Sequence, residues 1–447
     1  MDFDLIVHNG LIITMGPDFE IIQNGFIGIR QGKIADVRAM TPEESLPSAA
    51  DTIDAENGLI MPGLVNTHTH MPMAIFRGLA DDLPLDTWLN EHIFPAEAAH
   101  INPENVRLGT MLSCAEMLLS GTTTFCGGYF LEDSVADIVA EVGIRAVLGQ
   151  GVIDFPAPGV PDPEDNVKAA VAFVEKWTDK SPRILPSIFC HSPYTCSGKT
   201  LKSAKAAAES KDVLFQIHIA ETKNEKQMIQ TGKPSSPIQY LKDLGILDQQ
   251  TLLVHAVWVD EADIETIKEK GSAISHNAES NMKLASGIAP VHKFLRQGIT
   301  VGLGTDGCAS NNDLDLFQEM DVVAKLHKVS TLDPTVMDAE TVLKMATING
   351  ARAIGLGEIT GSLEMGKEAD LIVIDTHQPH LTPMYHPISQ LVYAARGSDV
   401  RHVVVSGTSL VRNRKLLTID ESELLKKVKK LSRAIAQKSP NVANAEE

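Results

Sequence analysis

Residues 59–70 read Leu59-Ile60-Met61-Pro62-Gly63-Leu64-Val65-Asn66-Thr67-His68-Thr69-His70, an apolar run that ends in two histidines. Because residues two apart on a β-strand point to the same side, His68 and His70 leave the end of this predicted strand together. Two neutral imidazole nitrogens that converge on one point suit a zinc-like metal. A pair of surface histidines at a strand end is the alternative, and the rest of the chain decides between the two.

Beyond this stretch, predicted strands alternate with predicted helices. Further strand-like runs lie at 121–126, 145–149, 184–189, 213–217, 251–254, 272–275 and 299–303, which with the first makes eight. Helical stretches lie between most of them, among them 105–119, 133–142 and 261–270. Strand–helix alternation over roughly 250 residues predicts a (β/α)8 TIM barrel. A doubly wound open sheet is the competing architecture.

The two ends of the chain look like parts of one small β domain. Strands are predicted at 5–7, 11–13, 28–30 and 33–35, separated by turns at Asn9-Gly10, Gly16-Pro17-Asp18, Asn24-Gly25 and Gln31-Gly32. Similar runs return at 369–374 and 402–408. Neither end makes a stable sheet alone. We therefore expect a β-sandwich domain from residues 1–60 and 359–420, a barrel over 61–358, and a helix and tail over 421–447.

Most of the chemistry-bearing residues follow the predicted barrel strands. All but the second and third strands end in a histidine or an aspartate: His68, His70, His191, His218, His255, His276 and Asp306. Because active sites of barrels collect at the carboxyl ends of the strands, a metal site is favoured over separate structural histidines. A catalytic zinc takes three or four protein ligands and keeps a position for water. We choose His68, His70, His218 and Asp306 as the ligands.

Glu221 follows His218 by three residues, where the predicted strand becomes a loop. A bound Zn²⁺ lowers the pKa of water to about 7, and hydrolysis also needs a group that carries protons. Glu221 is placed to do this without binding the metal; the alternative is a carboxylate at a helix N-terminus, favoured by the helix dipole.

Residues 302–307 match the dinucleotide fingerprint G-x-G-x-x-G, but no acid-ended strand follows, so we attribute the glycines to close packing around Asp306.

Composition limits the classes of partner. The 447 residues are 43% apolar and 22% charged, as in ordinary globular proteins. The net charge of −19, with no long basic run, argues against a nucleic-acid partner. No apolar run is long enough to span a bilayer, and the acidic N-terminus lacks the features of a signal peptide. The five scattered cysteines fit reduced thiols, so a cytoplasmic location without a membrane partner is expected.

With these residues in view, the chain resembles the amidohydrolase superfamily, and within it the 5-methylthioadenosine/S-adenosylhomocysteine deaminase family. The likeness covers nearly the whole chain and includes residues 5–10, the strand-one motif, 83–89, 93–97 and 361–371. It implies a distorted barrel of the metal-dependent hydrolase type with a β-sandwich from both ends. It also implies one zinc ion per subunit, with Fe²⁺ or Mn²⁺ as alternatives, a homo-oligomer, and a small nucleoside as substrate.

The resemblance also implies individual roles. Glu97, His191, Glu221 and Asp306 resemble substrate-binding residues, with Glu97 on the ribose hydroxyls. Glu221, His255 and Asp306 resemble the catalytic groups. In the implied hydrolytic deamination, activated water attacks C6 of adenine while Glu221 protonates N1, and ammonia leaves.

Three positions depart from family patterns. Cys190-His191 stands where binuclear members have a carboxylated lysine, which favours one metal over two. Ala278 stands where the family usually has proline. Residues 150–155 offer no arginine that could bind a homocysteine carboxylate. Methylthioadenosine is therefore better supported as a substrate than S-adenosylhomocysteine. The competing functions are hydrolysis of another amino- or halo-substituted heterocycle (triazine, aminopurine or pterin) and a non-catalytic binding scaffold.

Overall fold

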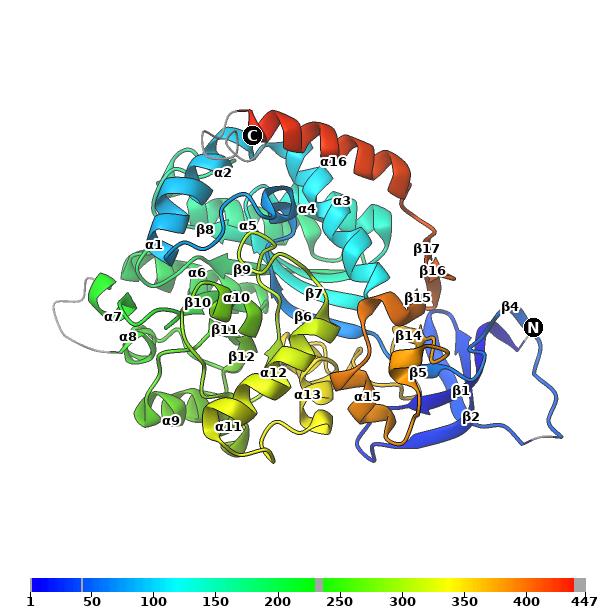
Figure 1. Cartoon of the computed structure of the whole chain (residues 1–447). Helices are drawn as coiled ribbons and strands as arrows, with labels where there is room; N and C mark the ends of the chain where they lie inside the picture. The colour runs from blue at the N-terminus through cyan, green and yellow to red at the C-terminus, as the bar shows by residue number, and fades with distance from the viewer. Residues whose placement is uncertain (1, 42, 230–235, 438–447) are drawn as a thin grey trace, which may run out of the picture.

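Two β-sheets organise the chain, one of eight strands in a barrel and one of nine strands built from both chain ends (Figure 1). The structure is a computed structural model that describes residues 2–41, 43–229 and 236–437. The tail predicted beyond the last helix, at 438–447, lies outside the described residues. In the described part of the chain, no helix is both long enough and apolar enough to cross a membrane.

The barrel strands run parallel and pair in chain order. They are β6 (Leu64–Thr69), β7 (Thr122–Tyr129), β8 (Arg145–Val152), β9 (Ile184–Cys190), β10 (Phe215–Ile219), β11 (Thr251–His255), β12 (Ala273–His276) and β13 (Val301–Leu303). The amide of Asp306, just beyond β13, donates to the carbonyl of His68 on β6 over 3.0 Å and so links the last strand to the first. All eight predicted strands are present, and the predicted barrel is confirmed over the doubly wound sheet.

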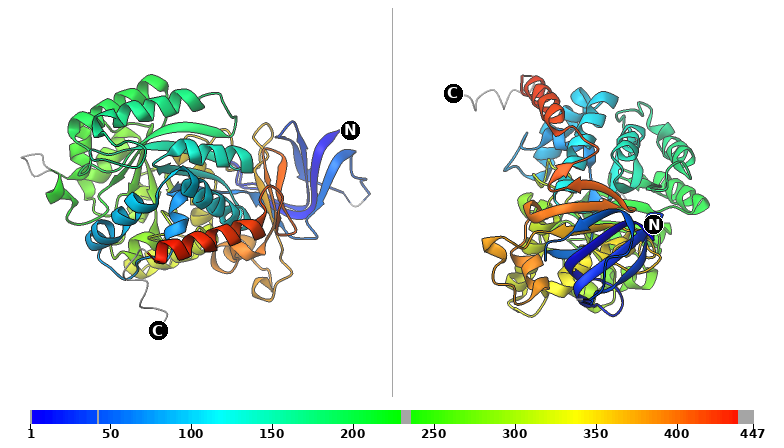
Figure 2. Two further views of the ribbon diagram at one scale, coloured as in Figure 1. Left: turned by 90° about the horizontal axis from the view of Figure 1, so that it is seen from above. Right: turned by 90° about the vertical axis from the view of Figure 1, so that its right-hand side faces the viewer.

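Helices surround the barrel strands (Figure 2). The larger ones are α3 (Pro103–Leu119), α4 (Glu132–Val142), α5 (Asn166–Trp177), α6 (Gly198–Lys211), α8 (Pro237–Leu244), α9 (Glu261–Lys270) and α12 (Leu316–Thr331). Helix α9 shows how the sequence sets helix boundaries. At its start, the side chains of Asp260 and Asp263 each accept a hydrogen bond from the other residue's backbone amide, and at its end Gly271 adopts a left-handed φ of 73°. The three helices predicted by residue range are confirmed.

The second sheet joins strands from the two ends of the chain. Its strands are β1 (Phe3–Ile13), β2 (Ile21–Arg30), β3 (Lys33–Ala39), β4 (Ala49–Asp54), β5 (Leu59–Pro62), β14 (Leu371–Ile374), β15 (Val400–Val405), β16 (Thr408–Arg412) and β17 (Lys415–Leu416). Strand β5 pairs with β1 on one side and with β14 on the other. Leu5, Ile27, Val373 and Val404 pack in one small core, so the two ends stabilise each other. The boundaries of the domains stay a prediction.

Two of the predicted turns are wrong. Asn9-Gly10 and Asn24-Gly25 lie inside β1 and β2, where the register shifts and Gly10 faces Gly25. Asn9 and Asn24 have φ values of 58° and 46°, as in bulged strands. A Cβ on Gly10 would lie 2.7 Å from the Ile60 side chain, so this glycine permits the close packing of β1 on β5.

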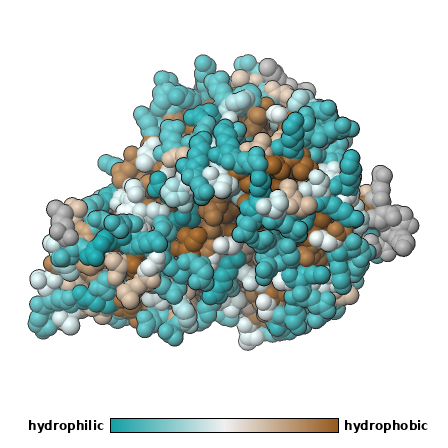
Figure 3. All heavy atoms as spheres, turned by 180° about the vertical axis from the view of Figure 1, so that it is seen from behind, coloured by the Kyte–Doolittle hydropathy of each residue, from teal (hydrophilic) through white to brown (hydrophobic). Residues whose placement is uncertain are grey.

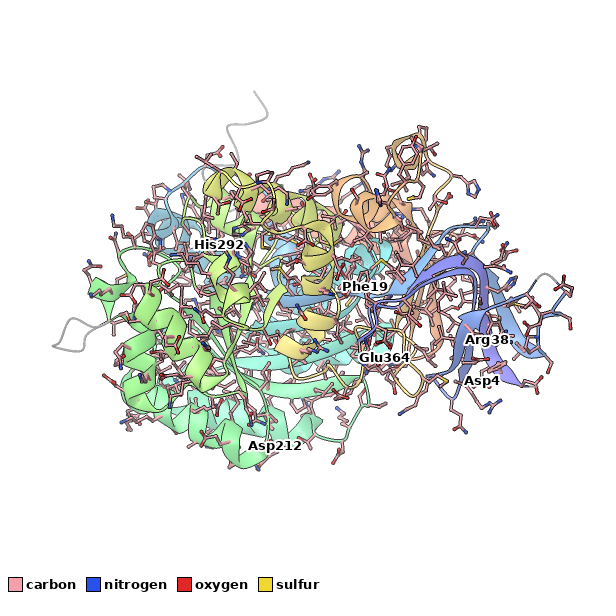
Figure 4. All side chains as sticks on the ribbon, turned by 90° about the horizontal axis from the view of Figure 1, so that it is seen from below. Asp4, Phe19, Arg38, Asp212, His292 and Glu364 are labelled. Carbon is pink, nitrogen blue, oxygen red and sulfur yellow. The ribbon has the colours of Figure 1, made fainter. Side chains whose placement is uncertain are left out.

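The last helix lies on the outer surface of the molecule, beside the barrel (Figure 2). The last helix, α16 (Glu421–Ala436), lies along the outside of the barrel beside α3 (Figure 2). In Figure 4, Asp4 and Arg38 mark the far side of the terminal sheet and Asp212 and His292 mark the barrel, with Phe19 and Glu364 nearer the junction. The face seen in Figure 3 is mainly hydrophilic, with apolar atoms interspersed, in keeping with the charged composition.

A buried ion pair joins the barrel to the terminal sheet. Arg145 begins β8, and its Nε lies 2.8 Å from Oδ2 of Asp370, which precedes β14. The two side chains are 2% and 0% exposed, so neither charge is solvated by water. Arg145 also donates to the Ser406 hydroxyl over 2.8 Å.

Replacing one member of this pair should destabilise the protein more than replacing both. Asp370→Ala leaves the guanidinium buried and unpaired, so the free energy of unfolding should fall by about 3–5 kcal/mol. The double variant Arg145→Met with Asp370→Leu should recover part of that loss, as measured by urea unfolding. Equal losses in the single and double variants would contradict this.

Candidate metal centre and active site

Four side chains at the carboxyl ends of the barrel strands bring their ligand atoms together. They are the four that the sequence suggested, His68, His70, His218 and Asp306, and their atoms lie within 4.8 Å of one another. The Nε2 atoms of His68 and His218 are 3.1 Å apart, and Nε2 of His70 is 3.3 Å from Oδ1 of Asp306. Ligands that bind a divalent metal at about 2.0–2.2 Å in a tetrahedron lie roughly 3.4 Å from each other. The donor set and its spacing fit a divalent metal ion.

The surrounding groups prepare the histidines to bind a cation. Nδ1 of His70 donates to the Gly128 carbonyl over 2.6 Å, which leaves the Nε2 lone pair facing Asp306. Burial lowers the pKa of His68 to about 4, and burial among the other imidazoles lowers the pKa of His218 well below its usual value. Both rings are therefore neutral at pH 7, the form that binds metals.

Asp306 is held by its own backbone and by two hydroxyls. Its φ of 60° lies in the left-handed region, which non-glycine residues adopt mainly where function or packing requires it. Its Oδ2 accepts hydrogen bonds from the Ser280 hydroxyl over 2.7 Å and from the Ser310 hydroxyl over 3.2 Å. Burial opposes the charge, but the contacts with His68 and His70 hold the pKa of Asp306 well below its usual range.

The glycines before Asp306 pack as the sequence indicated. A Cβ on Gly304 would lie 2.4 Å from the Asn277 side chain and 2.9 Å from the backbone nitrogen of His68. A Cβ on Gly302 would lie 2.3 Å from Thr67. The G-x-G-x-x-G match therefore reflects close approach of β13 to β6.

Glu221 and His255 lie together beside the four ligands. Oε2 of Glu221 is 3.8 Å from Nε2 of His255, and both residues line the same pocket as Asp306. Nδ1 of His255 donates to the side-chain oxygen of Asn281 over 2.9 Å, so Nε2 presents its lone pair to the pocket. Burial raises the pKa of Glu221. His255 has a φ of 77°, a second left-handed residue at a barrel strand end.

Glu97 lies in the same pocket on α2 (Phe94–His100), and it has a partner that sequence reasoning missed. The hydroxyl of Tyr129, at the end of β7, donates to the Glu97 carboxylate. Burial raises the pKa of Glu97 to about 7, against the opposing effect of that hydrogen bond. The sequence places Tyr129 at a strand end, and this position was the only signal. The residue was missed because the search considered histidines and carboxylates and not tyrosines.

His191 completes the set of expected substrate-binding residues in the pocket. Its Nδ1 is 2.9 Å from the Thr195 hydroxyl, and burial lowers its pKa to about 3, so the ring is neutral. His276, by contrast, does not line the pocket. Its Nε2 lies 3.1 Å from Nε2 of His327 on α12, so this strand-end histidine is part of the packing between β12 and the helix layer.

The alanine at position 278 has a structural role. It begins the short helix α10 (Ala278–Lys283), and its amide donates to Oε1 of the buried Glu319 over 2.6 Å. Helix α10 carries Ser280, which contacts Asp306, and Asn281, which contacts His255. Glu319 therefore anchors the helix that orients two site residues.

Restoring the usual proline at this position should damage the site. Ala278→Pro removes the amide donor and places the ring against Glu319, so α10 has to shift; we expect kcat to fall about tenfold while bound metal is retained. Glu319→Gln keeps an acceptor for the Ala278 amide and is the matched control, with less than a threefold change. Steady-state kinetics and metal analysis measure both, and unchanged kcat in Ala278→Pro would contradict the anchoring role.

Comparison with known proteins places this arrangement in a family. The sequence pattern of the amidohydrolase family matches residues 59–410. The 5-methylthioadenosine/S-adenosylhomocysteine deaminase of Syntrophobacter fumaroxidans is 47% identical, over 97% of this chain and 98% of that protein. The 5′-deoxyadenosine deaminase of Methanosarcina mazei is 43% identical, over 96% and 97%. A zinc-bound adenosine deaminase structure from Xanthomonas campestris is 36% identical with a TM-score of 0.94, over 97% and 99%. The chain belongs to the amidohydrolase family.

Removing one ligand should remove the metal. His218→Ala leaves three ligand side chains, and we expect less than about one tenth of a metal ion per chain together with loss of activity. His292→Ala, on α11 (Val291–Arg296) and outside the pocket lining, is the control and should keep its metal (Figure 4). Elemental analysis of both purified variants measures the metal content per chain. Full metal content in His218→Ala would exclude His218 as a ligand.

Proposed function

We propose that this chain is a zinc-dependent deaminase that converts the adenine ring of a 5′-substituted adenosine, such as 5′-methylthioadenosine, to the inosine analogue and ammonia. The observation that carries the proposal is the Glu221–His255 pair next to the four-ligand cluster, in one pocket with Glu97. The relatives named as deaminases of 5-methylthioadenosine, S-adenosylhomocysteine and 5′-deoxyadenosine support it.

One zinc ion per chain fits the donor set. His68, His70, His218 and Asp306 would hold it, and the imidazole-rich cluster suits zinc. When bound, zinc supplies a water molecule whose pKa is lowered to about 7. Cys190 and His191 at the end of β9 provide no bridging lysine for a second ion.

The protein groups around the cluster move the protons. His255 Nε2 and the Asp306 carboxylate accept protons from the attacking water, while Ser280 and Asn281 keep both groups in place. The raised pKa of Glu221 favours the protonated carboxyl that a donor to purine N1 needs. Protonation at N1 prevents charge from building up on the ring as the bond to C6 forms. The protons accepted from the attacking water then pass to the 6-amino group, the C6–N bond breaks, and ammonia leaves.

Two further side chains bind the nucleoside. The Glu97 carboxylate accepts hydrogen bonds from the ribose hydroxyls, with the Tyr129 hydroxyl orienting it. His191 lines the pocket and presents its Nε2, since Nδ1 is engaged by Thr195. A homo-oligomeric state and a cytoplasmic location stay predictions.

Incubation of the metal-loaded protein with 5′-methylthioadenosine should shift the purine absorbance and release one ammonia per nucleoside. Glu97→Ala should raise KM for the nucleoside at least tenfold and leave free adenine turnover nearly unchanged, because only the nucleoside has ribose hydroxyls. No turnover of any adenosine analogue would overturn the proposal. Turnover of a triazine, aminopurine or pterin instead would establish the alternative heterocycle activity.

The activity should depend on the ionisation of Glu97. Its pKa of about 7 means that the carboxylate becomes protonated as the pH falls through 7, and a neutral carboxyl accepts ribose hydrogen bonds more weakly. We therefore expect kcat/KM to decline below about pH 7. Glu97→Gln, neutral at every pH, should have a lower kcat/KM without this decline. Identical pH profiles from pH 5 to 9 for the two proteins would assign the decline to another group.

A further inference from the structure

The chain bends sharply between β10 and the loop that carries Glu221. Ala220, the first residue after β10, has a φ of 51° and so lies in the left-handed region, which alanine rarely adopts. Ala220 is fully buried and the Glu221 side chain is 12% exposed, so the bend lies inside the molecule. A strained backbone next to a candidate active site indicates that neighbouring groups hold it in place.

The carboxyl group of Glu225 reaches back to this bend. Glu225 begins the short helix α7 (Glu225–Met228), which follows the loop after β10 (Figure 1). Its Oε2 accepts a hydrogen bond from the backbone amide of Glu221 over 2.9 Å, and the Ala220 amide also faces this carboxyl. Successive backbone amides next to a left-handed residue form a concave nest that binds oxygen atoms. Here a side chain of the same loop occupies the nest.

The other end of the same peptide group is held by the loop after β11. The carbonyl of Ala220 accepts the backbone amides of Val257 over 3.0 Å and of Trp258 over 2.8 Å. That loop begins directly after His255, whose ring lies beside the Glu221 carboxyl in the pocket. The peptide group that joins Ala220 to Glu221 is thus engaged at its carbonyl and at its amide. This fixes the direction in which the Glu221 side chain leaves the backbone.

The burial of Glu225 makes its contact with the bend specific. The residue is 1% exposed, and its Oε1 has no hydrogen-bond partner among the described residues. Burying a carboxyl group with one unpartnered oxygen costs free energy, which the contact with the amides offsets. Burial raises the pKa of Glu225 to about 8, so the group is mostly neutral at pH 7 and adds little charge beside Glu221.

We propose that Glu225 is a positioning residue of the proposed deaminase, which holds the peptide group before Glu221 so that the Glu221 carboxyl faces His255 and N1 of the purine. The inference rests on the proposed function, in which Glu221 carries the proton to N1. Glu225 lies outside the lining of the pocket, so it acts on the reaction only through Glu221. The hydrogen bond to the Glu221 amide is what transmits its effect.

Three substitutions of Glu225 separate its hydrogen bond from its charge. Glu225→Ala removes the acceptor, and Glu225→Asp keeps a carboxyl on a side chain that is too short to reach the Glu221 amide. Both should lower kcat for 5′-methylthioadenosine about 10- to 100-fold and leave KM within about threefold, because a displaced proton donor impairs the reaction more than binding. Glu225→Gln keeps an acceptor oxygen and places its nitrogen where Oε1 has no partner, so kcat should stay within about threefold.

A double-variant cycle shows whether Glu225 acts through Glu221. Glu221→Ala removes the proposed proton donor, and adding Glu225→Ala should then lower kcat by less than about twofold more, because no donor remains to be positioned. Gln227→Ala, an exposed side chain on the same short helix, is the control for a general disturbance of α7 and should keep the kcat of the unsubstituted protein. Elemental analysis should find the metal retained in every variant, since all four ligand side chains are intact.

Amide hydrogen exchange measures the contact directly, whether or not the protein deaminates a nucleoside. In the metal-loaded protein, the peptide that contains the Ala220 and Glu221 amides should exchange at least about tenfold faster in Glu225→Ala and Glu225→Asp than in the unsubstituted chain. In Glu225→Gln the exchange rate should be close to that of the unsubstituted chain. Equal rates in all four proteins overturn the contact.

The outcomes separate this inference from the proposed function. If nucleosides are deaminated, unchanged kcat in Glu225→Ala, an equal loss in Glu225→Gln, or independent losses in the double variant each overturn the positioning role while the activity stands. Loss of the metal in Glu225→Ala overturns it as well, because the effect then passes through the ligand cluster. If no nucleoside is deaminated, the proposed function fails and the exchange rates decide. Faster exchange in Glu225→Ala but not in Glu225→Gln supports the role of Glu225 in holding the bend, and equal rates overturn it.

Discussion

The hydrogen bond from the Asp306 amide to the His68 carbonyl is the contact on which the site depends. It joins the eighth barrel strand to the first, and its two residues are both candidate metal ligands. An open sheet would leave these residues at opposite edges, many strands apart. Closure brings them next to His70 and His218, and the small residues Gly302 and Gly304 allow the backbones to approach closely enough. The geometry of the candidate metal site is thus a consequence of barrel closure.

Closure alone does not orient the candidate catalytic groups Asp306 and His255, and the short helix α10 supplies that orientation. Ser280 contacts the Asp306 carboxylate and Asn281 contacts the His255 ring, from adjacent positions on one turn. The helix is held in turn by Glu319, which accepts from the Ala278 amide. Left-handed backbone at His255 and Asp306 is maintained because such neighbours fix both side chains. Rigid second partners of this kind keep reacting groups in productive geometry.

The sequence predicted the strands, the barrel and the four clustered residues because their signals are local or periodic. An apolar run ending in His68 and His70 specifies both a strand and the direction of its last side chains. The turn prediction at Asn9-Gly10 was wrong because the same dipeptide occurs in hairpin turns and in bulges, and only the pairing of β1 with β2 distinguishes the two. His276 also ends a strand, but its ring contacts His327 on α12 and does not line the pocket, which the strand pattern alone does not distinguish. Tyr129 and Asn281 were missed because they act through hydrogen bonds between distant segments, which no local pattern records.

The candidate catalytic groups and the loops at the mouth of the pocket stand on different parts of the fold. The metal-ligand cluster and the Glu221–His255 pair stand at or next to strand ends, where parallel pairing limits their movement. Phe155, Lys223 and Trp258 stand in loops that the barrel does not constrain, so their identity can change without disturbing the strands. A residue that contacts the 5′ substituent of the proposed nucleoside is therefore to be sought in the loops at the mouth of the pocket.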